Sequence, residues 1–190
     1  YAGHTQELAR QATEDGCDLV ISYGGDGTLN QVVNGVMNAN GKPIVGAIPG
    51  GTANLWVNEM GMPNDNPVKA LLALLDNEER RVDVGHATVE QLFLPGDTQH
   101  AHNKRKKGGK QQILRPHFLL MAGLGLDAAV MQGVSKPLKH KVKQIAVGLS
   151  AAKELPAFHP FPLEVRDENH ALLWQGEALQ VVIGNTRLYA

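Results

Sequence analysis

The sequence has little cysteine, no long apolar run and almost no net charge. Cys17 is the only cysteine in 190 residues, so no disulfide can form within the chain, and we expect a reducing, cytoplasmic location. No apolar run approaches the ~18 residues that span a bilayer, and no signal peptide is expected. The formal net charge is -1, so no overall basic field attracts nucleic acid. These absences exclude a disulfide scaffold, a helical membrane span and a strongly basic nucleic-acid binder.

The composition is that of a globular protein. Hydrophobic residues make up 43% and charged residues 19%, enough apolar side chains for a packed core. A chain of 190 residues fits one large or two small domains. The periodicity changes near Arg81. We therefore predict an α/β domain over residues 1–81 and a mainly β domain over residues 82–190.

The most informative stretch runs from Tyr23 to Asn30 and reads YGGDGTLN. An apolar segment, Leu19–Ile21, precedes it and predicts a short buried strand. After it, apolar residues recur at helical spacing, with Asn30, Gln31 and Asn34 outside the stripe. The apolar stripe comprises Leu29, Val32, Val33, Val36 and Met37. The glycines therefore lie at a strand-to-helix junction.

Such a junction is suited to bind phosphate. Glycine lets a bulky anion approach the backbone, and a helix start offers unpaired N–H groups at a positive dipole end. Asp26 would repel a phosphate, so its carboxylate suggests a bridging Mg²⁺ or a proton to be moved. The alternative is a tight turn with a solvated aspartate. The succession of strand, glycine turn and amphipathic helix favours nucleotide binding.

A second glycine-rich turn, Pro49–Asn54, follows the predicted buried strand Ile44–Ile48. Predicted helices fill the rest of this half: Gln6–Thr13 ended by Gly16, Leu55–Met60, and one from Pro67 to Leu75 capped by Asn66. Alternating strands and helices with short connections predict a parallel sheet. Ligands bind at the carboxyl ends of such strands, so we expect both turns to form one site.

The second half has the pattern of strands. The predicted strands cover residues 87–94, 116–124, 161–165 and 172–183. A polar, basic loop spans residues 96–115, and a helix with several lysines spans Leu138–Leu149. Basic residues flanking apolar ones suit an anionic membrane surface, although a solvated helix face is the commoner explanation.

Two motifs carry a resemblance to a known family. Gly24–Gly35, GGDGTLNQVVNG, resembles the nucleotide motif of the diacylglycerol kinase catalytic-domain family, which includes bacterial lipid kinases and sphingosine kinases. Pro49–Asn54, PGGTAN, resembles the second motif at similar spacing. Arg81–Gly85 and Gly123–Ala128 resemble two further segments. GGDGT alone is shared with NAD kinases and approximates a phosphofructokinase motif, whereas the pair of motifs is specific.

The resemblance implies an α/β nucleotide-binding domain, similar to those of NAD kinases and phosphofructokinases, followed by a mainly β lipid domain. It implies Mg²⁺-dependent transfer of the γ-phosphoryl group of ATP to a hydroxyl of a lipid such as diacylglycerol. Asp26 would organise metal and phosphate, and Asp83 would reach the metal through water. The residues expected to hold ATP are Gly24, Gly25, Asp26, Gly27, Thr28, Leu29, Asn30, Gly51, Thr52 and Asn54.

The sequence departs from the family pattern at Gln31, where glutamate is usual, and at Leu55, where many members have aspartate. Loss of the glutamate removes a charge beside the phosphates. The family's opening strand would precede Tyr1, and its catalytic base, an aspartate followed by glycine, would follow Ala190. Asp26 would then support catalysis without being the base.

Several alternatives stay open. Thr28 and Thr52 are also typical helix N-caps. Asp83 could pair with Arg80 or Arg81 instead of binding metal. A NAD kinase-like enzyme and a non-catalytic nucleotide- or lipid-binding regulator are the competing functions. The expected partners are a lipid substrate, a peripheral membrane surface and a second copy in a homodimer, without nucleic acid.

Overall fold

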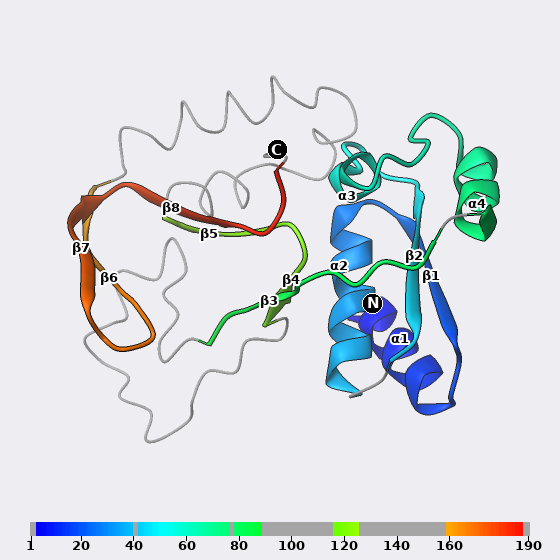
Figure 1. Cartoon of the computed structure of the whole chain (residues 1–190), viewed down its shortest axis with the longest axis horizontal. Coiled ribbons are helices and arrows are strands. Elements are labelled where there is room, and N and C mark those ends of the chain that lie inside the picture. Colours follow the sequence, from blue (N-terminus) through cyan, green and yellow to red (C-terminus); the bar gives the residue numbers. More distant parts are fainter. Residues whose placement is uncertain (1–2, 40–41, 77, 89–115, 126–158, 188–190) are drawn as a thin grey trace. The chain divides into compact units, whose positions relative to one another are not determined.

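The computed structural model describes residues 3–39, 42–76, 78–88, 116–125 and 159–187 (Figure 1). They pack into two compact units. Unit 1 comprises Tyr1–Met121 and Gly184–Ala190, and unit 2 comprises Ala122–Ile183. The predicted basic loop 96–115 and the predicted helix 138–149 lie outside the described residues.

The sheet of unit 1 is parallel, as predicted. β1 (Leu19–Gly24) pairs with β2 (Ile44–Pro49) from Leu19 opposite Ile44 to Gly24 opposite Pro49. α2 (Asp26–Asn38) forms the crossover between them. Figure 1 shows the two strands between α2 on one side and α4 (Pro67–Asp76) on the other. The predicted strand–helix–strand unit is thus confirmed.

The helix ends follow local chemistry. α1 (His4–Glu14) is followed by Gly16 at φ 83°, the left-handed conformation that stops a helix. The Asn66 side chain caps α4, since its Oδ1 accepts the N–H groups of Val68 and Lys69 at 2.8 and 3.2 Å. α3 (Leu55–Glu59) is a short helix directly after the second glycine-rich turn. No helix among the described residues is long and apolar enough to cross a membrane.

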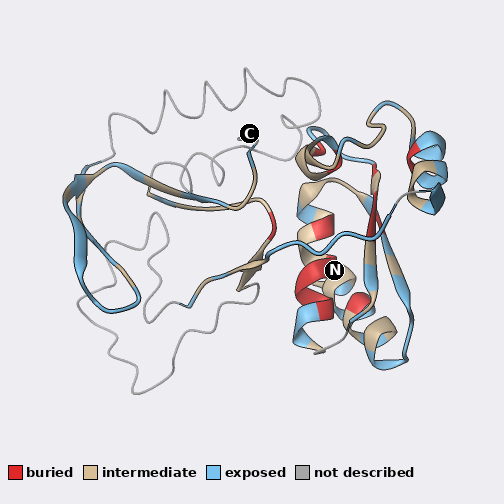
Figure 2. Cartoon of the chain, viewed as in Figure 1, coloured by how far each residue is buried: buried red, intermediate tan, exposed pale blue. Residues whose placement is uncertain are grey.

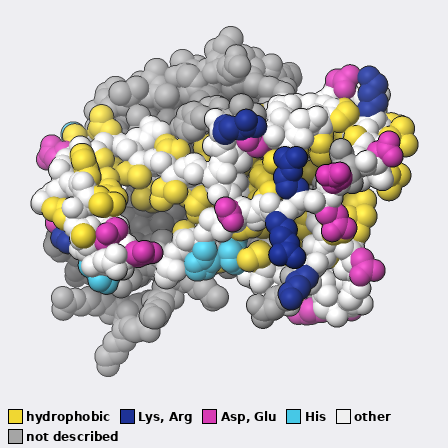
Figure 3. All heavy atoms as spheres, viewed as in Figure 1, with side chains coloured by type: hydrophobic (Ala, Val, Ile, Leu, Met, Phe, Trp, Pro, Cys, Tyr) yellow, Lys and Arg dark blue, Asp and Glu magenta, His cyan; other side chains and the backbone are white. Residues whose placement is uncertain are grey.

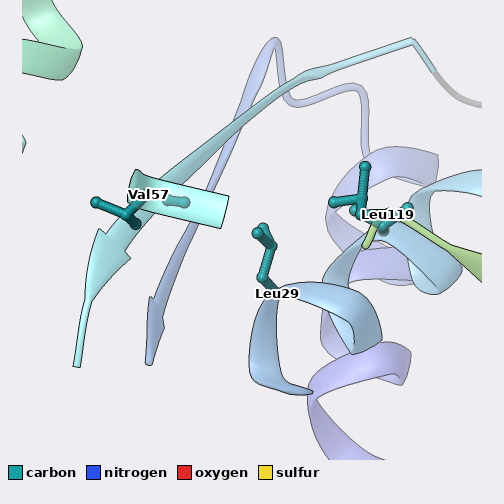
Figure 4. Packing of buried hydrophobic residues seen from close by; sticks show 5 residues of the cluster. Leu29, Val57 and Leu119 are labelled. Atoms are coloured by element: carbon teal, nitrogen blue, oxygen red, sulfur yellow. The ribbon is translucent and has the colours of Figure 1, made fainter. Parts of the chain in front are cut away.

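The core of unit 1 lies around α2, where buried residues gather in Figure 2. One cluster joins helices, β2 and the segment after β4: Leu29, Val33, Ala47, Val57 and Leu119. In Figure 4 the Leu29 side chain lies between Val57 and Leu119. A second cluster, Ala9, Val32 and Val36, packs α1 on α2. Leu29 therefore fixes the motif helix to the core at its first turn.

Three predictions about burial in unit 1 are wrong. Asn34, expected outside the apolar stripe, is fully buried, whereas Met37, expected inside it, is 40% exposed. Leu19 and Ile21, expected in a buried strand, are more than 40% exposed. The described sheet has two strands, and its α4 face is covered mainly over β2, where Leu74 lies against Gly46. One face of β1 is thus only partly covered.

Asn34 is buried because it holds a strand to α2. Its Oδ1 accepts the N–H of His117 at 3.0 Å, and its Nδ2 donates to the His117 carbonyl at 2.8 Å. The same Nδ2 donates to the Asn30 carbonyl at 2.8 Å. β4 (His117–Phe118) pairs in turn with β3 (Gly85–His86). A buried amide with all its partners satisfied thus attaches this ladder to the motif helix.

In unit 2 the strands pair over short and long sequence separations. β6 (Phe161–Arg166) and β7 (Leu172–Ala178) form an antiparallel hairpin, and β5 (Met121–Gly125) pairs with β8 (Gln180–Gly184). The predicted run 172–183 is therefore two strands in two sheets, divided at Leu179, and the predicted run 116–124 is divided between β4 and β5. Alternation alone does not show where a strand changes sheet.

The compact units divide between Met121 and Ala122, beyond the domain boundary predicted near Arg81. The physical reason is the attachment of β4 to α2 through Asn34, which keeps the segment after Arg81 in unit 1. The predicted strand over 87–94 lies mostly outside the described residues, and β3 ends before it at His86.

Candidate functional site

The two glycine-rich turns lie against each other at the carboxyl ends of β1 and β2. Gly24 is opposite Pro49 in the sheet, and the Gly50 N–H donates to the Gly24 carbonyl at 2.9 Å. A Cβ built on Gly51 would lie 2.9 Å from the Gly25 nitrogen and closer still to its Cα. Backbone thus packs directly on backbone, and the two turns meet at one edge of the sheet as predicted; that they form one binding site stays a prediction.

The glycines of the first motif have different surroundings. A Cβ on Gly24 would collide with the Thr28 side chain, and one on Gly25 would lie 3.0 Å from Gly51 Cα. Close packing therefore explains why glycine is needed at both Gly24 and Gly25. Gly27 differs, because a Cβ there would meet nothing within 4 Å and the residue is exposed in the first turn of α2. The N–H groups of Thr28 and Leu29 already donate to the Gly25 carbonyl, so an anion at this open position would meet the N–H groups that precede them at the helix start.

Asp26 joins the two motifs. Its Oδ2 accepts the N–H of Leu55 and its Oδ1 accepts the N–H of Trp56, both at 3.1 Å. The carboxylate thereby caps the start of α3, where a negative charge is favourable. Each oxygen accepts one of these bonds and keeps further acceptor capacity. The geometry thus shows a structural role for Asp26 and leaves room for a second role.

Asn54 holds the second turn closed. It adopts the left-handed conformation at φ 48° and ψ 49°, and its Oδ1 accepts the Gly51 N–H at 2.9 Å. Its Nδ2 donates to the Gly51 carbonyl at 3.3 Å and to the Asn64 Oδ1 at 2.7 Å. The buried side chain is committed to the turn, so its first function is to shape the loop.

Neither threonine is a helix N-cap. The N-cap of α2 is Gly25 and that of α3 is Asn54, neither with a side-chain cap bond. Thr28 packs over Gly24, and Thr52 is exposed in the second turn. The capping alternative from the sequence is therefore wrong for both, and Asp26 performs the capping of α3.

A small pocket opens between the turns. Of the predicted ATP residues, five line it: Gly24, Gly25, Asp26, Leu29 and Asn54. The other five, Gly27, Thr28, Asn30, Gly51 and Thr52, lie around the same junction without lining it. Leu29 is a core residue, 4% exposed. The Oδ1 of Asn30 is buried and has no hydrogen-bond partner among the described residues, so it could still accept a donor.

Asp83 lies in a neighbouring groove of unit 1, in a segment that precedes β3 and is not itself a strand. Its side chain is exposed and forms no ion pair with a described residue, so the predicted alternative of a pair with Arg80 or Arg81 is absent here. The groove also includes Trp56, which lines the Asp26 pocket as well. Trp56 thus lines both the pocket that contains Asp26 and the groove that contains Asp83.

The residues present are compatible with Mg²⁺. No cluster of three or more His, Cys, Asp or Glu side chains able to hold a metal occurs in the described part of the chain. Mg²⁺ typically binds through one or two carboxylates together with substrate phosphates and water. Asp26 with spare acceptor capacity and the unpaired, exposed Asp83 match that donor set.

Sequence reasoning missed two features of this region. Asn185 donates through Nδ2 to the carbonyls of Asp83 and Leu119, both at 2.9 Å. Arg187 donates to Glu59 at 2.9 Å, which connects the segment after β8 to α3. The one available signal was the Gly184-Asn185 pair after an apolar strand, and it does not indicate a partner 102 residues away.

A histidine pair lies on the β3–β4 ladder. The rings of His86 and His117 have centroids 4.8 Å apart. Burial lowers the pKa of His117 from its ordinary value of 6.5, and the neighbouring His86 lowers it further. Histidine side chains form a visible patch on the face in Figure 3, where acidic and basic side chains are also interspersed. Protonation of His117 is thus disfavoured in the folded chain.

Comparisons with known proteins agree with these features. A family model described as "Diacylglycerol kinase catalytic domain" matches residues 1–87. A protein of Bacillus subtilis named "Diacylglycerol kinase" is 28% identical over 182 residues, 96% of this chain and 51% of that protein. A Chromohalobacter salexigens protein named "Probable lipid kinase YegS-like" is 42% identical over 85 residues, 44% of this chain and 27% of that protein. The chain spans about half the length of the Bacillus relative.

The fold also matches solved structures. A structure titled as a putative diacylglycerol kinase from Bacillus anthracis superposes with a TM-score of 0.69 at 24% identity, over 100% of this chain and 53% of that one. A second, from the same organism, gives a TM-score of 0.65 at 23% identity over 99% and 52%. Residues 1–87, which contain both glycine-rich motifs, are therefore similar to the diacylglycerol kinase catalytic domain, and the solved structures agree with the chain in fold.

Proposed function

We propose that the complete protein is a lipid kinase that transfers the γ-phosphoryl group of ATP to a hydroxyl of a lipid such as diacylglycerol. The observation that carries the proposal is the contact of two glycine-rich turns at the carboxyl ends of β1 and β2, with Asp26 bonded across them. The names of the relatives support a lipid acceptor.

In this proposal the chain supplies positioning and charge. The open side at Gly27 and the first N–H groups of α2 receive phosphate oxygens, while Gly24 and Gly25 keep the turn narrow. Asp26 and Asp83 hold Mg²⁺, which when bound would offset the charge of the phosphates. Asp26 also fixes the start of α3, so the same carboxylate sets the distance between the two motifs.

The proposed overall arrangement is the two-domain one, with a nucleotide domain similar to those of NAD kinases and phosphofructokinases and a β-rich lipid domain. A family-type aspartate base beyond Ala190 belongs to this proposal.

The proposed setting is the cytoplasmic surface of a membrane, where the protein would act as a homodimer and would bind no nucleic acid. The basic segments 96–115 and 136–143, outside the described residues, would contact anionic lipid. Their neutralisation should weaken sedimentation with anionic vesicles.

The direct test is transfer of radiolabelled γ-phosphate from ATP by the complete protein, with Mg²⁺ and micelles of diacylglycerol, phosphatidylglycerol or a sphingoid base. We expect label in one of these lipids and its loss without Mg²⁺. Label in NAD instead would support the NAD kinase alternative. ATP binding without label in any acceptor would support the non-catalytic regulator. Neither alternative gains support from the relatives named above.

A further inference from the structure

We infer that Asn185 is a positioning residue that holds Asp83 beside the nucleotide motifs; this inference rests on the proposed role of Asp83 toward Mg²⁺. Asn185 itself touches neither ATP nor lipid in this proposal. It acts on the backbone that carries Asp83.

The hydrogen bonds of Asn185 converge on two segments far apart in the sequence. Its Nδ2 donates to the Asp83 carbonyl and to the Leu119 carbonyl, each at 2.9 Å, and its main-chain N–H donates to the Leu120 carbonyl at 2.7 Å. An amide nitrogen has two hydrogens, so both are used. No aliphatic side chain could bridge the two carbonyls, and neither serine nor threonine carries two donors.

The hydrogen bonds from Asn185 to the carbonyls of Asp83 and Leu119, called the clamp below, link Asp83 to the core of unit 1. Leu119 is 5% exposed and packs in the cluster with Leu29 and Val57, the residues that fix α2 and α3 (Figure 4). Asp83 itself is exposed and belongs to no helix or strand, whereas its neighbour Val84 packs against the same cluster. The bond from Asn185 to the Asp83 carbonyl adds a direct hydrogen bond to this residue. The Asn185 side chain thereby ties the Asp83 backbone to the Leu119 backbone.

The place of Asn185 in the groove supports a functional role for the clamp. Asn185 and Asp83 both line the groove, and Trp56 lines this groove as well as the Asp26 pocket. The Asp83 carboxylate has no ion-pair partner among the described residues that would orient it. Its backbone must therefore be fixed by other means if the carboxylate is to meet a metal reproducibly.

The test measures Mn²⁺ affinity of the complete protein with ATP by electron paramagnetic resonance, using Mn²⁺ as the probe for Mg²⁺. We expect Asn185→Ala to weaken Mn²⁺ binding about tenfold, the usual effect of losing a group that orients a metal ligand. Arg187→Ala is the matched control, since it releases the same segment from Glu59 through an 86% exposed side chain without touching Asp83. It should leave Mn²⁺ affinity unchanged.

A double-mutant cycle separates positioning from general destabilisation. If Asn185 acts through Asp83, Asn185→Ala should add little to the loss caused by Asp83→Ala. Equal losses in both backgrounds, or wild-type Mn²⁺ affinity in Asn185→Ala, would overturn the inference. If circular dichroism shows that Asn185→Ala does not fold, Asn185→Gln takes its place, because glutamine keeps both amide donors. We expect Asn185→Gln to bind Mn²⁺ with an affinity between those of wild type and Asp83→Ala. An affinity equal to that of wild type would count against the proposed geometry.

Lipid phosphorylation by the wild-type protein is measured in parallel. If no lipid accepts phosphate but Asn185→Ala still weakens Mn²⁺ binding through Asp83, the proposed function fails and the positioning role stands. If lipid is phosphorylated and Mn²⁺ binding is indifferent to Asn185, the positioning role alone fails.

Discussion

The main-chain N–H of Trp56 donates to the carboxylate of Asp26 at 3.1 Å, across 30 residues of sequence. Together with the bond from Leu55, it makes one acidic side chain the link between the two glycine motifs. Substitution of this residue should therefore affect stability as well as catalysis.

Asp26→Asn should lower turnover by about 10²–10³, as expected when a preorganised charge at the reacting phosphate is lost. It should also lower the free energy of unfolding by about 1 kcal/mol, because the amide oxygen can accept only part of what two carboxylate oxygens accept. Label transfer and urea unfolding measure the two effects. Asp65→Asn, at an exposed pair with Lys69, is the control and should change neither. Unimpaired turnover in Asp26→Asn would remove this carboxylate from the mechanism.

Gly51→Ala and Gly27→Ala should have opposite effects on stability. A methyl group on Gly51 collides with Gly25, so we expect a loss of about 1–3 kcal/mol in the free energy of unfolding. A methyl group on Gly27 has open space within a helix, so stability should rise by about 0.5–1 kcal/mol. If phosphate occupies that space, ATP affinity of Gly27→Ala should still fall about tenfold. Calorimetric titration with ATP checks this, and unchanged affinity would place the phosphate elsewhere.

Asn34→Ala should be strongly destabilising, by about 2–3 kcal/mol, since it leaves the buried N–H and carbonyl of His117 without their partner. Asn38, exposed on the same helix, provides the control, and Asn38→Ala should change stability by no more than about 0.5 kcal/mol. Chemical unfolding of both variants makes the comparison. Similar small losses in both would show that β4 stays attached to α2 without this amide.

Acid should destabilise unit 1 through His117. Its pKa in the folded protein is lowered by burial and by His86, so the unfolded chain binds more protons between that pKa and the ordinary value of 6.5. Stability from this group is therefore present above about pH 6.5 and is lost as the pH falls toward the lowered pKa. His117→Gln should flatten this part of the profile, and it retains the Asn34 bonds, which involve only the His117 backbone. His170→Asn, at an exposed turn, should leave the profile unchanged; identical profiles for wild type and His117→Gln would contradict the assignment.

Local patterns predicted the helices, strands and turns of the first half of the chain well, because each of these signals acts within a few residues. Asn66 before Pro67, Gly16 after a helix and the two glycine-rich turns all specify backbone geometry within a few residues, and the structure has each where expected. The burial of Asn34 could not be predicted this way. Its partner His117 lies 83 residues away, so periodicity treats it as a polar surface residue.

The candidate site shows the same division. The contact of the two turns followed from the rule for parallel sheets, but the capping of α3 by Asp26 did not, since it depends on how two loops fold over each other. Asn185 was missed for the same reason as Asn34. An amide side chain that bonds distant backbone gives no sequence signal beyond its own identity. Here Asn34 attaches β4 to α2, and Asn185 joins the segments of Asp83 and Leu119.

The position of Trp56 provides an optical reporter. The chain has two tryptophans, and Trp174 lies 46% exposed on β7 in unit 2. With Trp174 replaced by phenylalanine, the emission would come from the indole that borders both the Asp26 pocket and the Asp83 groove. Occupation of either space should alter the emission, so nucleotide and divalent ions can be titrated separately without a label. One indole would then report which of the two spaces is occupied first.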